Sequence, residues 1–193
     1  RSISNLEFSK DSEVINLNNG EIYQINAEIV KTKINGNDIR MFGYNGQIPG
    51  PLLKVKQGSK ISIDFKNELD QETTVHWHGL RLDNAFDGVP GITQEPIKHG
   101  ETFRYELSLP DPGMYWYHPH IREDYQQELG LYGNILVIPN EENYFNKVNR
   151  EEFVFIDDIQ IDREDINLFF KDFTTQALMG RFGNVMLING KED

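Results

Sequence analysis

The sequence predicts an all-β fold of the sandwich or barrel type, and three observations support this prediction. Apolar and charged residues alternate with a period of two at 60–66 and 103–109, as strands with one buried face require. Turn-forming residues separate such segments at short intervals, as at 45–51 and in Asp111-Pro112-Gly113. Before residue 140 the only convincing helical stretch is short and polar, at 122–129, and is ended by Gly130.

The same criteria place the other elements and divide the chain into parts. Strands are expected where branched and aromatic residues gather between turns, at 21–33, 52–56, 73–78 and 134–138. A polar stretch at 140–150 follows Pro139 and is predicted to be a linker, after which strand patterns resume at 153–161 and 184–188. We therefore expect a first domain at 1–139 and the beginning of a second β-domain at 151–193, which is too short to bury a core unaided.

Composition excludes several classes of function. The chain has 193 residues, and 19 Lys and Arg against 31 Asp and Glu give a net charge of -12, which disfavours binding to nucleic acid or anionic lipid. No apolar run approaches the roughly 18 residues of a membrane-spanning helix. Cysteine is absent, so disulfides, thiolate nucleophiles and iron–sulfur clusters are excluded within the chain, and any metal must use histidine or carboxylate ligands.

Four of the five histidines fall into two His-x-His triplets, His76-Trp77-His78 and His118-Pro119-His120. Residues two apart on a strand point to the same face with Cα atoms about 6.6 Å apart, so both imidazoles of a triplet can converge on one site. Trp77 is then expected on the opposite face. Pro119 predicts a strand end or edge for the second triplet, because proline lacks an amide donor.

Imidazole ligands without thiolates suit copper, zinc, iron or nickel, and the affinity order favours copper. A single His-x-His is weak evidence, because such histidines are often ordinary residues of a β protein. Two triplets offer more ligands than one ion ordinarily takes from a small strand region, so a cluster of adjacent ions is the natural hypothesis. His99, in Lys98-His99-Gly100, is expected to be an ordinary exposed residue of a polar turn.

These motifs resemble the first two copper-binding motifs of multicopper oxidases, a family that includes laccases, ascorbate oxidases and bacterial copper-efflux oxidases. The matching segments are 76–80 and 113–120, which occur in the family's order. The turn at 45–51 resembles the family's Asn-Gly-x-x-Pro-Gly-Pro turn, and 125–133 resembles the segment leading from the second motif into the next strand. The resemblance covers about residues 15–138 and implies a cupredoxin-like Greek-key β-barrel or sandwich.

The resemblance implies a role for each histidine in a trinuclear copper cluster. His76 would bind the type 2 copper. His78 and His118 would bind one of the two type 3 coppers, and His120 would bind the other. Asp87 matches the acid that assists proton delivery to oxygen in this family, although an aspartate before glycine is also a common turn former.

The resemblance also implies an enzyme in which a substrate gives single electrons to a type 1 copper while the cluster reduces dioxygen to water. The family takes the other half of the cluster histidines and the type 1 cysteine from its last domain. This chain has neither, so it is expected to be inactive alone, either as a fragment or as a subunit completed by another chain. Trp116 and Tyr117 are interpreted as packing residues rather than as electron relays.

The implied partners are the remaining cupredoxin domains, dioxygen and an electron donor such as a phenol, Cu(I) or Fe(II). The family also implies an extracytoplasmic location. Two alternatives stay open: a non-catalytic copper-binding or structural cupredoxin, and a copper nitrite reductase. In the latter a cysteine follows a ligand histidine, whereas Pro119 and Ile121 follow the histidines of the second triplet here.

Overall fold

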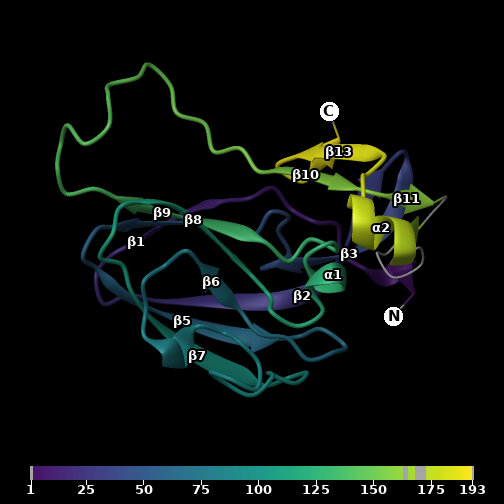
Figure 1. The fold of residues 1–193 in the computed structure, drawn as a ribbon, viewed down its shortest axis with the longest axis horizontal. Helices are drawn as coiled ribbons and strands as arrows, with labels where there is room; N and C mark the ends of the chain where they lie inside the picture. The colour runs from purple at the N-terminus through teal and green to yellow at the C-terminus, as the bar shows by residue number, and fades with distance from the viewer. Residues whose placement is uncertain (1, 163–164, 168–172, 193) are drawn as a thin grey trace.

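The computed structural model describes residues 2–162, 165–167 and 173–192, and most of these residues form a two-layer β sandwich (Figure 1). The first sheet has the strand order β3-β2-β5-β7. Its strands are β2 (Ile22–Ile34), β3 (Asn37–Tyr44), β5 (Lys60–Asn67) and β7 (Thr102–Ser108). In β5 the apolar residues of the alternating pattern are buried and the charged residues lie on the outer face, which confirms the all-β prediction.

The second sheet carries both histidine triplets. Its order is β1-β4-β9-β8-β6, made of β1 (Val14–Leu17), β4 (Leu52–Lys56), β6 (His76–His78), β8 (Gly113–His118) and β9 (Gly133–Ile138). Strand β8 runs antiparallel to both of its neighbours, β6 and β9. Because β6 is the edge strand and pairs His76 with His118, the first triplet lies beside the end of β8.

Large aromatic side chains fill the space between the two sheets. Tyr44 of β3 meets Tyr117 of β8 with ring centroids 5.2 Å apart, and Trp77 of β6 meets Tyr105 of β7 edge to face at 5.4 Å. All four side chains are fully buried. Burial of this kind stabilises a fold by roughly 25 cal/mol per Å² of apolar surface, so these four rings form a well-packed core behind the histidines.

After β9 the chain arches away from the sandwich and returns at β10 (Ile156–Ile159), as Figure 1 shows. Strand β10 pairs with β13 (Val185–Ile188), which pairs with β14 (Lys191–Glu192). The short strands β11 (Ile161–Asp162) and β12 (Asp165–Ile166) form a second pair. The helices are α1 (Glu123–Gln126) and α2 (Phe173–Met179), with 3-10 turns at Ile3–Asn5 and Asn84–Phe86. Neither described helix is long and apolar enough to cross a membrane.

Three expected elements have different bounds in the structure. The strand expected at 73–78 is reduced to β6, because the amide of Val75 donates to the Tyr105 hydroxyl at 2.9 Å instead of to a neighbouring strand. The helix expected at 122–129 begins only at Glu123, since Arg122 has a left-handed backbone with φ 45°, and it ends at Gln126, after which the chain forms a turn in which the Gly130 amide donates to the Gln127 carbonyl at 2.9 Å. The strand expected at 153–161 begins only at Ile156, and α2 was not predicted.

Candidate metal centre

The rings of all four triplet histidines gather at the edge of the second sheet. Ligand nitrogens of His76, His78 and His118 lie within 4.8 Å of one another. The ring of His120 lies 4.7 Å from that of His76 and 5.6 Å from that of His118, measured between centroids. Strand alternation brings the first triplet to one face, and the register of β6 against β8 adds His118 to it.

Asp87 holds the ring of His76 in one orientation. The Nδ1 of His76 lies 2.7 Å from the carbonyl oxygen of Asp87 and 3.3 Å from a carboxylate oxygen of the same residue. A carbonyl oxygen only accepts, so the Nδ1–H donates to it and the lone pair resides on Nε2. Gly88, with φ 75°, allows this close approach, because a Cβ at its position would lie 1.9 Å from the carbonyl oxygen of Val75.

His78 and His118 face each other with nitrogen atoms that can both be ligands. The Nδ1 of His78 lies 3.3 Å from the Nε2 of His118. The other nitrogen of His118, Nδ1, lies 2.9 Å from the carbonyl oxygen of Pro119 and therefore carries the proton, which leaves the Nε2 lone pair facing His78. In the metal-free chain the Nδ1–H of His78 therefore donates to this Nε2, and with the His78 proton on its Nε2 instead, the two facing nitrogens can hold one ion between them.

Burial keeps His118 neutral. Its side chain is 3% exposed, and this desolvation lowers its pKa to about 4, with the neighbouring histidines adding to the effect and the Pro119 carbonyl opposing it. Trp116 covers one face of the ring, stacked at 4.1 Å between centroids. A neutral imidazole has the free lone pair that a metal ligand requires.

His120 lies beyond the end of β8 and is held by side chains. Its amide donates to the Thr74 hydroxyl at 3.3 Å, and its Nδ1 lies 2.8 Å from a carboxylate oxygen of Glu123. A carboxylate acceptor places the proton on Nδ1 and leaves the lone pair on Nε2. Three of the four rings therefore have Nδ1 occupied by an oxygen acceptor and Nε2 available.

Trp116 and Glu123 are site residues that the sequence interpretation missed. Trp116 is half-buried and contacts the rings of both His118 and His78, so it is more than a core residue. Trp116 lies two residues before His118 on the same strand, and this spacing could have indicated that its side chain shares the face of the histidines. Tyr117 is fully buried, and its hydroxyl donates to the Pro51 carbonyl at 2.7 Å, as expected of a packing residue. His99 is exposed, as predicted.

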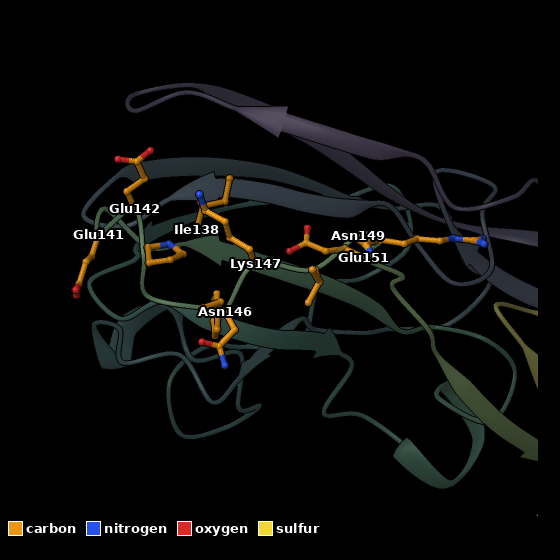
Figure 2. A pocket seen from close by; sticks show the side chains of 11 residues that line it. Ile138, Glu141, Glu142, Asn146, Lys147, Asn149 and Glu151 are labelled. Carbon is orange, nitrogen blue, oxygen red and sulfur yellow. The ribbon is translucent and has the colours of Figure 1, made fainter.

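A hollow of about 620 Å³ lies beside the loop after β9 and is distinct from the histidine site (Figure 2). It is lined by Ile138, Pro139 and residues of the loop that follows them, among them Glu142 and Lys147. Figure 2 shows these side chains spread along the loop rather than converging on one point. The histidines are not among the lining residues, so the hollow adds nothing to the metal centre.

Comparison with known proteins identifies the family. Residues 26–142 match the family model described as multicopper oxidase. The chain is 34% identical over 181 residues to the multicopper oxidase mco of Staphylococcus aureus, covering 91% of this chain and 39% of that protein. It is 31% identical over 147 residues to copper resistance protein A of Pseudomonas syringae pv. tomato, covering 76% of this chain and 24% of that protein.

Solved structures agree with this assignment. A multi-copper oxidase from Pseudomonas thermotolerans superposes with a TM-score of 0.82 at 30% identity, covering 94% of this chain and 43% of that chain. A multicopper oxidase from Campylobacter jejuni, described as a metallo-oxidase, gives a TM-score of 0.75 at 27% identity, covering 97% of this chain and 43% of that chain. The chain thus spans less than half the length of these relatives. Its cupredoxin-like fold and its matched residues establish that the chain belongs to the multicopper oxidase family.

Proposed function

We propose that this chain supplies half of the histidine ligands of a trinuclear copper cluster in a laccase-like multicopper oxidase. The whole enzyme would oxidise a substrate one electron at a time and reduce dioxygen to water. The observation that carries the proposal is the meeting of four imidazoles from two chain segments, each with a ring nitrogen available to a metal. Family membership supports copper as the metal, and an all-imidazole donor set fits it.

The proposed assignment distributes the four histidines over three copper ions. His76 binds the type 2 copper through Nε2, because its Nδ1 is engaged by Asp87. His78 and His118 share one type 3 copper through the two nitrogens that lie 3.3 Å apart. His120 binds the other type 3 copper through Nε2. Its Nδ1 is engaged by Glu123, which leaves Nε2 for this ion.

The residues of this chain orient the ligands and handle protons, while the copper ions, when bound, supply the electron transfer to oxygen. Trp116 stacks on His118 and excludes water from one face of that ring. Asp87 is proposed to deliver protons, since its carboxylate lies beside His76 and is partly exposed to solvent. General acid–base groups placed in this way typically contribute a factor of about 100 or more to a rate.

Replacement of Asp87 tests the proton role. Asp87→Asn keeps the backbone carbonyl that meets His76 but removes the ionisable group, so copper content should be unchanged while oxygen consumption falls by about 100-fold. Asp83→Asn is the matched control in the same loop: the Asp83 side chain accepts from the amide of Ala85, and asparagine caps a turn equally well. Equal rates for both variants would contradict the role of Asp87.

The function itself is tested on the whole protein that carries this chain. The protein is expressed with copper, its metal content is measured, and oxygen consumption is followed with a phenol, Cu(I) and Fe(II). Copper uptake with oxygen consumption for at least one donor is the expected result. Copper uptake without oxygen consumption would instead favour a non-catalytic copper-binding cupredoxin.

Two further expectations belong to the same proposal. We propose that residues 1–139 form one cupredoxin domain, 140–150 a linker, and 151–193 the beginning of a second domain, consistent with the loop between β9 and β10. The completing domains and the electron donor are proposed as partners. An extracytoplasmic location is proposed from the family, and cell fractionation tests it.

A further inference from the structure

We infer that Glu123 is a positioning residue for His120, acting through a carboxylate–imidazole contact that selects which ring nitrogen of His120 faces the metal. The inference rests on the proposed function, because it assigns a partner to one of the proposed copper ligands. It goes beyond that function by adding a residue outside the His-x-His motifs. The observation is the 2.8 Å contact between the Glu123 carboxylate and Nδ1 of His120.

A neutral imidazole carries its proton on one of two nitrogens, and the hydrogen bond of one nitrogen decides which remains a ligand. The Glu123 carboxylate only accepts, so it places the proton of His120 on Nδ1. The lone pair then resides on Nε2, in a ring that lies 4.7 Å from the ring of His76. The negative charge of Glu123 also raises the basicity of the imidazole, so its lone pair binds a metal more strongly.

His120 differs from the other histidines in how this proton is held. For His76 and His118 the Nδ1 meets backbone carbonyl oxygens, at 2.7 and 2.9 Å, which side-chain substitution leaves in place. For His120 the acceptor is a side chain on α1. The orientation of His120 therefore depends on one replaceable residue, which makes the inference open to a direct test.

Helix α1, which begins at Glu123, is anchored to the sandwich by two of its side chains. The side chain of Gln126 is fully buried, accepts from the Thr73 hydroxyl at 2.7 Å and donates to the carbonyl of Glu72 at 2.8 Å. Tyr125 packs edge to face on Phe42 at 5.8 Å. These contacts fasten α1 to the sandwich, and Glu123 is the first residue of α1, in contact with His120.

The backbone before α1 supports the same placement. Arg122 has φ 45° and ψ 56°, the left-handed backbone conformation that residues other than glycine rarely adopt. Arg122 turns the chain between the end of β8 and the start of α1. This turn brings Glu123 back into contact with His120, three residues earlier in the chain. Unusual backbone of this kind persists where the surrounding structure over-determines it, as at binding sites.

The test compares three variants in the whole protein. Glu123→Ala removes the acceptor, and Glu123→Gln keeps an oxygen acceptor without the charge. Asp124→Asn is the matched control, because Asp124 lies in the same turn and pairs with Arg122 at 2.9 Å. Since Glu123 is about half exposed, with 47% of its side chain accessible, none of these changes should unfold the protein.

Two quantities are measured. Nitrogen-15 NMR of the copper-free, histidine-labelled protein, at a pH where the rings are neutral, reports the tautomer of His120, which is assigned with a His120→Gln variant. Titration of copper into the same protein against a competing chelator reports affinity. We expect Glu123→Ala to mix the two tautomers and to lower the affinity of one copper by about 10- to 100-fold. Glu123→Gln should lose less, and Asp124→Asn should match the wild type.

An unchanged His120 tautomer in Glu123→Ala overturns the inference. A changed tautomer with unchanged copper affinity also overturns it, but leaves the proposed function intact. If the wild-type protein takes up no copper, the proposed function fails and the inference falls with it, whatever the NMR signals show. Mixed tautomers and lower copper affinity in Glu123→Ala, with partial rescue by Glu123→Gln, support the inference and the proposed function together.

Discussion

The two His-x-His triplets have the same spacing but are built differently. All three residues of His76-Trp77-His78 belong to strand β6, with Trp77 fully buried on the opposite face. In the second triplet only His118 belongs to β8, while Pro119 and His120 lie past the end of the strand. The first pair of rings is aimed by the pleat of a strand. The second is aimed by a strand end together with contacts from Thr74 and Glu123.

This difference shows that one sequence pattern can be supported by two kinds of physical constraint. The pleat depends on the core behind it, so the first triplet should respond mainly to changes in packing. The second triplet depends on burial and on a few polar contacts, so it should respond to protonation and to single side chains. Three predictions test this division.

The largest effect is expected at the central residue of the first triplet. Trp77→Ala removes a fully buried ring that packs on Tyr105 and Tyr117, at 5.4 and 5.5 Å, and should lower the free energy of unfolding by about 3 to 5 kcal/mol. The equivalent change in the second triplet, Pro119→Ala, removes a smaller buried side chain and gives the unfolded chain more freedom, so it should cost only about 1 to 2 kcal/mol. Urea unfolding of the copper-free variants gives both values, and equal costs would refute the division.

A pH-dependent effect is expected from the second triplet. Burial lowers the pKa of His118 to about 4 from the ordinary value of 6.5, so its stabilising contribution is complete above pH 6.5. As the pH falls from 6.5 toward 4 the unfolded chain takes up the proton first, and the free energy of unfolding should fall by at most about 3 kcal/mol. Urea unfolding across this range measures the loss.

The control for this prediction is a pair of histidine variants. His118→Gln should show a smaller loss of stability over the same pH range. His99→Gln, which changes an exposed histidine outside the cluster, separates this loss from the general effect of removing a histidine. If His118→Gln retained the full dependence, another group would have to carry it.

The smallest of the three effects concerns the loop behind His76. Gly88→Ala and Gly91→Ala both place a side chain at positive φ, 75° and 72°, and should share the cost of that conformation. A Cβ at Gly88 would also lie 1.9 Å from the Val75 carbonyl oxygen, whereas nothing lies within 4 Å at Gly91. Gly88→Ala should therefore cost about 1 to 3 kcal/mol more than Gly91→Ala. Thermal unfolding of the pair tests this, and equal costs would contradict the close contact.

The fold was predictable where local pattern and long-range packing agree. The alternating segments that became β4, β5, β7 and β9 were placed within one residue, because one face of each is buried. Strand β6 was predicted too long, since a tyrosine hydroxyl from β7 satisfies the backbone of Val75. No local pattern could reveal such a partner 30 residues away along the chain.

The site was predictable where the spacing of residues along a strand determines the direction of their side chains. Strand alternation directs the rings of the first triplet, and one turn brings Asp87 to His76, but the two triplets meet only through the long-range pairing of β6 with β8. The contact of Glu123 with His120 depends on the left-handed conformation of Arg122, a residue type that rarely adopts it. The stacking of Trp116 on His118 follows from alternation, and was missed because an aromatic residue on a strand is most often part of a core.

The flat stacking of Phe155 on Tyr132, 4.3 Å apart and 9° from parallel, has a consequence for any cut in the loop after β9. Phe155 also lies near Trp116, with ring centroids 6.5 Å apart, so residues beyond the loop help to form the wall behind His118. A protease could nick the exposed loop and leave this aromatic wall assembled. Removal of everything after the nick would instead bare Tyr132 and Trp116 to water, so the shorter piece would keep its histidines but lose part of their shelter.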